Sequence, residues 1–141
     1  MSQPQSVFHL AFHVSDLELA ERFYVDVLGA LPGRRSDTWV DVIWMGHQLS
    51  MHLGQPFAHT HTGRVGKHWV PMPHFGLVVL KPTWDDIKAR LEAHGVAMDI
   101  PPHVRFAGQP GEQSTLFFRD PFGNPIEIKG YANWQDIDAN H

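Results

Sequence analysis

The sequence predicts an α+β fold built from two βαβββ modules, which form a cupped mixed sheet with helices outside. The chain has 141 residues, 43% hydrophobic and 18% charged, which suits a single domain, residues 1–141, with a buried core. Strand-like and helix-like patterns follow in the same order in two stretches, residues 7–54 and 72–131. Glycines mark matching points of both stretches, at helix ends and at tight turns. Together these features indicate a degenerate internal repeat.

The first module begins with residues 7–14, whose polarity alternates as in a half-buried strand. The run Ser15-Asp-Leu-Glu18 predicts a capping box that starts a helix. Apolar residues follow at helical spacing, and Gly29 stands where a helix would end. Two more strands are predicted at residues 38–45 and 48–53, joined at Gly46.

The second module repeats this order. Its expected elements are a strand at 74–80, a helix capped at 83–86 and closed by Gly95, and strands at 96–100, 113–119 and 124–130. His9 aligns with His74, Gly29 with Gly95, and Gly46 with Gly123. Between the modules, residues 55–71 are predicted to form a surface loop or dimer arm that carries His59, His61 and His68.

Side chains of a strand alternate between its two faces, so each strand's pattern assigns its residues to the core or to the cup. The residues expected to pack in the core are Leu10, Phe12, Val14, Ile126 and Ile128. Those expected to face the cup are His9, Ala11, His13, Pro125, Glu127 and Lys129. The repeat places His74 in the second module where His9 lies in the first.

Histidine is unusually abundant, with 11 residues, whereas cysteine is absent, which excludes disulfides and thiolate ligands. If an approximate twofold relates the modules, His9, His74 and Glu127 converge in the cup. Two imidazoles and one carboxylate leave coordination positions open, a composition suited to Fe(II). Mn(II), Zn(II) and Ni(II) are alternatives.

The repeat also identifies a fourth symmetric position. Glu127 follows Gly123 by four residues, and Ser50 follows Gly46 by four. Serine is a poor metal ligand, so three protein ligands are expected. Gln48 shares a face with Ser50 and replaces it as a fourth ligand if the register slips.

Four segments resemble the vicinal oxygen chelate superfamily, which includes glyoxalase I, bleomycin-resistance proteins, fosfomycin-resistance thiol transferases and extradiol dioxygenases. They are FHLAFHVSDL at 8–17, FY with VLG at 23–29, PHF at 73–75 and FFRDPFGNPIEI at 117–128. The resemblance covers the chain except the 55–71 stretch and the C-terminal tail. It implies metal ligation by His9, His74 and Glu127. Residues 102–106 and 108–113 also resemble a branch of small proteins described as predicted extradiol-type dioxygenases.

The resemblance implies a metal-dependent oxygenase of the extradiol ring-cleaving type, acting on a small catechol-like substrate with vicinal oxygens. Glyoxalase I typically adds a first-half ligand, where Ser50 lacks a carboxylate. A glyoxalase-like lyase or isomerase, or a thiol transferase, using the same metal is the alternative. A non-catalytic module that binds an antibiotic or another small molecule is a third reading, against which the three ligands argue.

The sequence offers candidate acid–base residues, for each of which a structural role is the alternative. His52 shares a face with Ser50 and is a candidate acid or base. His103 is a candidate shuttle for the catechol proton, and Arg105 a candidate partner for an anionic substituent. Lys129 pairs with Glu127 or with an anionic substrate, and His13 is expected near the rim or a subunit contact.

Charge and targeting features limit the partners. The net charge is −4 and no basic stripe is present, so we expect no nucleic acid. The apolar runs are only strand-length, so no membrane span is expected. Residues 1–6 lack signal-peptide features, and we predict a cytoplasmic protein. Pairing of exposed sheet edges predicts a homodimer.

Overall fold

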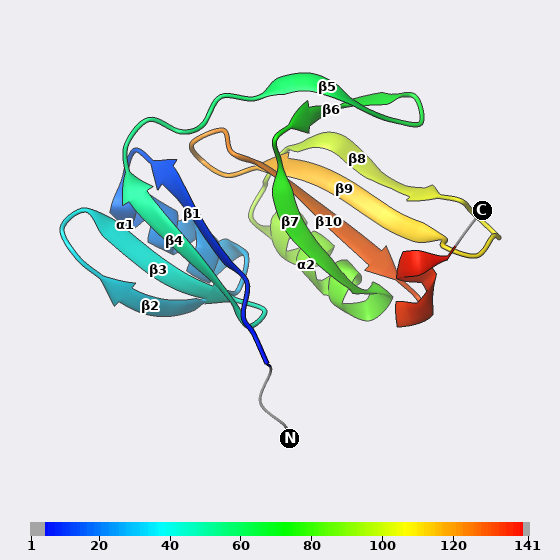
Figure 1. Cartoon of the computed structure of the whole chain (residues 1–141), viewed down its shortest axis with the longest axis horizontal. Coiled ribbons are helices and arrows are strands. Elements are labelled where there is room, and N and C mark those ends of the chain that lie inside the picture. The colour runs from blue at the N-terminus through cyan, green and yellow to red at the C-terminus, as the bar shows by residue number, and fades with distance from the viewer. Residues whose placement is uncertain (1–4, 140–141) are drawn as a thin grey trace. The chain divides into compact units, whose positions relative to one another are not determined.

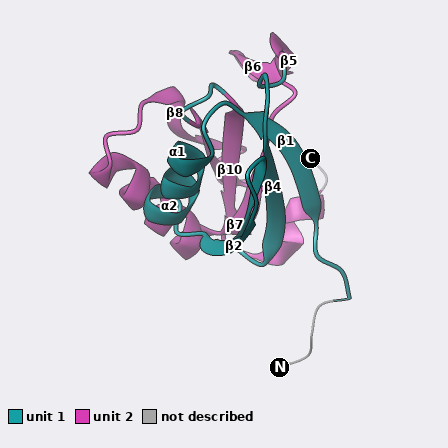
Figure 2. Cartoon of the chain, turned by 90° about the vertical axis from the view of Figure 1, so that its left-hand side faces the viewer, with its two compact units in different colours: residues 1–57, 121–123 teal, residues 58–120, 124–141 magenta. Residues whose placement is uncertain are grey.

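The computed structural model describes residues 5–139 and divides into two compact units (Figures 1 and 2). The first comprises residues 1–57 and 121–123, and the second residues 58–120 and 124–141. Each unit contains a four-stranded sheet with helical structure, and the second also contains a two-stranded sheet. His141 and part of the segment tested for a signal peptide lie outside the described residues.

The first unit contains one βαβββ module. Its elements are β1 (His9–Val14), α1 (Leu17–Arg22) with a π-helical turn (Phe23–Val27), β2 (Leu31–Arg35), β3 (Trp39–Trp44) and β4 (His47–Leu53). The strand order is β1-β4-β3-β2, with β1 parallel to β4 and the other pairs antiparallel. Gly29 has φ +77°, which matches the glycine expected beyond the helix. The mixed α+β character is therefore confirmed in this half.

Two details of this module differ from the sequence expectation. The helix is capped by Asp16, whose carboxylate accepts from the Leu19 N–H at 3.0 Å, so the capping box at Ser15 is wrong by one residue. Strand β2 was not expected because Pro32 and Gly33 interrupt its pattern. It is the edge strand of the sheet, where a missing N–H donor is tolerated.

The second unit repeats the module with a longer helix. Its elements are β7 (Phe75–Leu80), α2 (Lys81–Ala93), β8 (Met98–Arg105), β9 (Gln113–Arg119), β10 (Pro125–Tyr131) and a 3₁₀ turn (Trp134–Asp138). The strand order is β7-β10-β9-β8, with β7 parallel to β10. The strand at 113–119 is confirmed to the residue, but β8 extends beyond the expected 96–100. It continues through two prolines because it is an edge strand.

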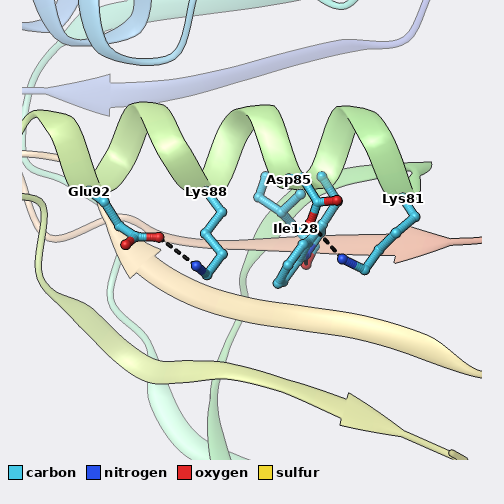
Figure 3. Close-up of polar contacts among 6 residues, drawn as sticks. Lys81, Asp85, Lys88, Glu92 and Ile128 are labelled. Atoms are coloured by element: carbon cyan, nitrogen blue, oxygen red, sulfur yellow. Dashed lines mark hydrogen bonds and ion pairs between the residues drawn. The ribbon is translucent and has the colours of Figure 1, made fainter.

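Helix α2 begins earlier than predicted and packs on the sheet through its expected apolar face. Pro82 lies in the first turn, where its missing N–H costs nothing, so the cap predicted at 83–86 is wrong. The buried residues are Trp84, Ile87 and Leu91. The Trp84 indole donates to the Ile128 carbonyl at 3.0 Å. Two ion pairs lie along the helix, Lys81–Asp85 at 2.5 Å and Lys88–Glu92 at 2.6 Å (Figure 3).

The stretch predicted as a surface loop contains a hairpin instead. Strands β5 (Thr60–Val65) and β6 (His68–Met72) pair antiparallel in the second unit (Figure 1). Gly66 adopts φ +59° in the two-residue turn, a conformation that glycine adopts without strain. The sequence did not predict these strands because a glycine and a proline interrupt them, and neither shows a regular apolar alternation.

The registers of the two sheets agree with the alignment made from the sequence. In the first, His9 pairs with Gln48. In the second, Phe75 pairs with Ile126, which places His74 and Pro125 at the same step. Ser50 and Glu127 therefore occupy equivalent positions. Phe12, Val14, Ile126 and Ile128 are buried as expected, while His9, Ala11 and His13 are exposed. Within residues 5–139, neither α-helix has the length and apolar character needed to cross a membrane.

Candidate functional site

His74 and Glu127, two of the three predicted ligands, face each other in the second unit. His74 directly precedes β7, and Glu127 lies within the adjacent strand β10. The His74 Nε2 and Glu127 Oε1 atoms are 3.2 Å apart. Gly76 lies opposite Glu127, and a Cβ there would come within 1.6 Å of the Glu127 carbonyl oxygen. Glycine is therefore needed for this close backbone approach.

The second ring nitrogen of His74 determines the character of this pair. Its Nδ1 lies 2.6 Å from the Pro71 carbonyl oxygen, which only accepts, so Nδ1 carries a hydrogen. In the neutral ring, Nε2 then presents a lone pair to a carboxylate oxygen. Two acceptors at 3.2 Å repel unless a proton or a metal ion lies between them. The pair is therefore arranged to hold a cation.

The protonation equilibria of the metal-free pair agree with this arrangement. The hydrogen bond to Glu127 raises the pKa of His74, although burial opposes the change. Burial acts to raise the pKa of Glu127, but the hydrogen bonds from His74 and Thr115 outweigh it and lower that pKa. The carboxylate is consequently held ionised, as a metal ligand requires.

The rest of the pair's environment orients both groups. Thr115 on β9 donates to Glu127 Oε2 at 2.6 Å, and the Phe117 ring lies edge-on to His74, with centroids 5.0 Å apart. The sequence analysis did not identify Thr115. The feature that could have identified Thr115 is a hydroxyl residue on the strand next to Glu127, on the same face of the sheet. A hollow of about 220 Å³ is lined by both His74 and Glu127, together with Lys129.

His9, the third predicted ligand, lies in the first unit and has a comparable partner. Its Nδ1 is 2.7 Å from the Gln48 side-chain oxygen, so this nitrogen carries a hydrogen and Nε2 presents a lone pair. The Gln48 amide nitrogen donates to Asp41 at 3.4 Å. Gln48 therefore orients His9, and the register shows no slip that would move Gln48 to the position of Ser50.

Ser50 is engaged by a carboxylate that the sequence analysis did not identify. Its hydroxyl donates to Asp41 Oδ1 at 2.6 Å, and both residues are buried. Asp41 and Ser50 are paired across β3 and β4. Asp41 corresponds in register to Phe117 of the second unit, not to Glu127. Asp41 therefore binds the side chain of Ser50, the residue at the position where a fourth ligand would lie.

The donors present suit an oxygen- and nitrogen-binding divalent ion. Two cis ligands of an octahedral ion, each at about 2.1 Å, lie about 3 Å apart, close to the separation of the His74 and Glu127 atoms. Among the described residues, 5–139, no three His, Asp or Glu side chains are gathered so that they could hold a metal ion. Participation of His9 therefore stays a prediction.

The candidate acid–base residues lie at different distances from these groups. His52 is exposed at the end of β4, opposite His13, four residues or about 13 Å along the strand from Gln48. His13 contacts the Gln55 carbonyl oxygen at 3.1 Å, and both histidines line a hollow of about 340 Å³. His103 on β8 pairs with Thr115 on β9, which in turn pairs with Lys129 on β10, two residues from Glu127. His103 is therefore two strand spacings, about 10 Å, from Lys129 and somewhat further from Glu127.

Two of the histidines between the modules, His59 and His61, contact each other in the second unit. His59 Nε2 lies 2.7 Å from Arg119 Nη1, and Arg119 also donates to Asp99 at 2.5 Å. His59 and His61 are in ring contact, with centroids 6.0 Å apart. These contacts tie the start of the hairpin to β8 and β9, which explains why the stretch is not a free loop.

Comparison with known proteins identifies the family. Residues 6–128 match the model of the Glyoxalase/Bleomycin resistance protein/Dioxygenase superfamily. The chain belongs to this superfamily. A glyoxalase/bleomycin resistance protein/dioxygenase from Alicyclobacillus acidocaldarius is 30% identical, with a TM-score of 0.78, covering 97% of this chain and 99% of the other.

More distant members of the superfamily share the fold. A lactoylglutathione lyase from Agrobacterium tumefaciens is 21% identical, with a TM-score of 0.62 and coverage of 94% and 98%. A fosfomycin resistance protein from Listeria monocytogenes is 18% identical, with a TM-score of 0.64 and coverage of 96% and 98%. The superfamily includes enzymes with different chemistry, so the site residues have to carry the functional argument.

Proposed function

We propose that this protein is a metal-dependent oxygenase of the extradiol ring-cleaving type. Its substrate would be a small catechol-like molecule with two vicinal oxygens. The observation that carries the proposal is the His74–Glu127 pair, 3.2 Å apart, with His74 Nδ1 bonded to Pro71 and Glu127 Oε2 bonded to Thr115. The two remaining atoms form a nitrogen and oxygen donor pair for a divalent cation, with Fe(II) preferred.

His9 is proposed as the third ligand. It occupies the position of His74 in the internal repeat, and an acceptor likewise fixes its Nδ1 hydrogen. Outer partners of this kind commonly hold metal-binding histidines in the required tautomer and orientation. Gln48 and Pro71 would thus perform the same task in the two halves of the chain.

Three protein ligands would leave three octahedral positions open. When bound, the metal ion would supply sites for both vicinal oxygens of the substrate and for dioxygen. The buried Asp41–Ser50 hydrogen bond supports this count, because it engages the hydroxyl at the position equivalent to Glu127. A four-ligand glyoxalase I-type site is less compatible with that arrangement.

His103 is the proposed acceptor of the substrate hydroxyl proton. Its Nδ1 is bonded to the Pro101 carbonyl oxygen at 2.9 Å, so the neutral ring has a lone pair on Nε2. It lies on the sheet face shared with Thr115 and therefore with Glu127. His52 remains the other candidate, but its strand end is further from the position of the ligands.

The decisive experiment is reconstitution with Fe(II) under anaerobic conditions, followed by oxygen uptake with a panel of catechols. We expect uptake and a ring-cleavage chromophore with wild-type protein and neither with the Glu127→Gln variant. Lys88→Gln, at a partly exposed position of α2, is the control.

Two results would overturn the proposal. Turnover of a hemithioacetal or a thiol-transfer substrate, with no oxygen uptake, would assign the same metal to lyase or transferase chemistry. Lack of affinity for any divalent ion, together with tight binding of an aromatic antibiotic, would assign the fold to a binding protein.

A further inference from the structure

A basic hollow lies at one end of the second sheet, apart from the metal ligands. It has a volume of about 310 Å³ and is formed by the β5–β6 turn and the end of β8. Its lining contains four basic or imidazole side chains, Lys67, His68, His103 and Arg105. No acidic side chain is among the described residues that line it.

The side chains of this hollow are ordered by contacts with one another and with an aromatic ring. The His68 and His103 rings lie 4.8 Å apart, centre to centre, and are tilted by 38°. The Arg105 guanidinium lies 4.6 Å from the centre of the Phe106 ring. Because cation–π contact holds the guanidinium over a ring face, its edge N–H groups remain available for a planar partner.

The backbone at the rim is strained. Phe106 adopts φ +57°, a left-handed conformation that costs a non-glycine residue about 1–2 kcal/mol. Such strain in a bulky residue persists where the surrounding structure needs it, often beside ligand sites. Here the turn at Phe106 places its ring against Arg105, at the edge of the hollow.

We propose that this hollow binds the anionic group, a carboxylate or phosphate, of a small aromatic ligand. Lys67 and Arg105 both line the hollow and no carboxylate accompanies them there, so a bound anion would offset their like charges. A guanidinium also offers paired N–H groups to carboxylate or phosphate oxygens. The tilted imidazole pair and the Phe106 ring provide flat surfaces beside the anion.

The hollow's position relates it to the proposed active site. His103 lies opposite Thr115, and Thr115 donates to Glu127, so the hollow and the carboxylate share one face of the sheet. The separation of β8 and β10 is about 10 Å, or two strand spacings. The group bound in the hollow would therefore be an acidic tail of the catechol-like substrate. This identification rests on the proposed function.

The test uses metal-free protein and a matched pair of probes, 3-phenylpropionate and its neutral amide, in calorimetric titrations at low salt. We expect the acid to bind at least about tenfold more tightly than the amide. Lys67→Gln and Arg105→Gln should each reduce this preference about three- to tenfold, and Arg105→Lys should restore part of it. Phenyl phosphate, measured in parallel, distinguishes a phosphate from a carboxylate as the preferred anion.

Lys88→Gln provides the control because it removes the same charge from a partly exposed position on α2, outside the hollow (Figure 3). It should leave the preference unchanged. Equal binding of acid and amide by the wild type, or equal effects of Lys88→Gln and Arg105→Gln, would overturn the inference. Since no metal is present, failure of the oxygenase assay would not alter this result, and loss of the anion preference would leave the metal-site proposal intact.

Discussion

The two four-stranded sheets share one register but place their buried carboxylates on different strands. In the second sheet, Glu127 on β10 directs one oxygen at His74 and the other at Thr115. In the first, Asp41 on β3 directs one oxygen at Ser50 and the other at Gln48. The strand on which each carboxylate lies thus determines its role: Glu127 is a candidate metal ligand, whereas Asp41 orients neighbouring polar side chains.

The difference also shows how a repeated fold becomes asymmetric. Each half contributes one histidine whose Nδ1 is held by an acceptor, Gln48 in the first and Pro71 in the second. Only the second half adds a carboxylate beside its histidine. The proposed three-ligand arrangement therefore takes one histidine from each half and its carboxylate from the second half.

The largest expected effect compares the two buried carboxylates directly. Glu127→Gln should weaken Mn(II) binding more than about 100-fold, because the substitution removes a charged ligand. Loss of a ligand has a larger effect than loss of a residue that only orients one, which typically costs about 10–100-fold. Asp41→Asn should weaken binding less than about tenfold, because Asp41 acts through Gln48. Calorimetry on protein stripped of metal measures both. Equal losses would show that the two carboxylates do not differ in role.

The next prediction concerns the partner of His9. Gln48→Leu should reduce Mn(II) affinity about 10–100-fold, since the imidazole loses the acceptor that fixes its tautomer. The His9 ring resonances in NMR spectra of metal-free protein should report the altered tautomer. Gln109→Leu, at an exposed position, is the control. An unchanged His9 tautomer in the Gln48 variant would contradict the assigned role.

A smaller effect is expected on folding stability. Asp41→Ala leaves the Ser50 hydroxyl and the Gln48 amide without their acceptor, so the free energy of unfolding should fall by about 1–2 kcal/mol. Asp85→Ala, which removes an exposed ion pair on α2, should cost no more than about 0.5 kcal/mol. Urea denaturation of metal-free protein measures both. Equal changes would mean that the Asp41 network contributes nothing beyond a surface pair.

Much of the fold could be predicted because it depends on local sequence patterns, such as polarity alternation in strands and glycines at helix ends. The alternation in β1 and β10 correctly assigned Phe12, Val14, Ile126 and Ile128 to the core. Gly29 and Gly95, at the ends of the helical segments, have positive φ values. The prediction failed where local preference was overruled by position, as in β2 and β8, whose prolines are tolerated at sheet edges.

The sequence by itself determined the order of the elements other than β2, β5 and β6, the equivalence of His9 with His74, and the face on which Glu127 lies. These properties follow from periodicity along the chain. Tertiary structure alone decided that Thr115 bonds to Glu127, that Asp41 engages Ser50 and Gln48, and that the ring of His68 meets that of His103. Such contacts depend on how strands pair and where a hairpin folds back, which a residue's immediate neighbours in sequence do not specify by themselves.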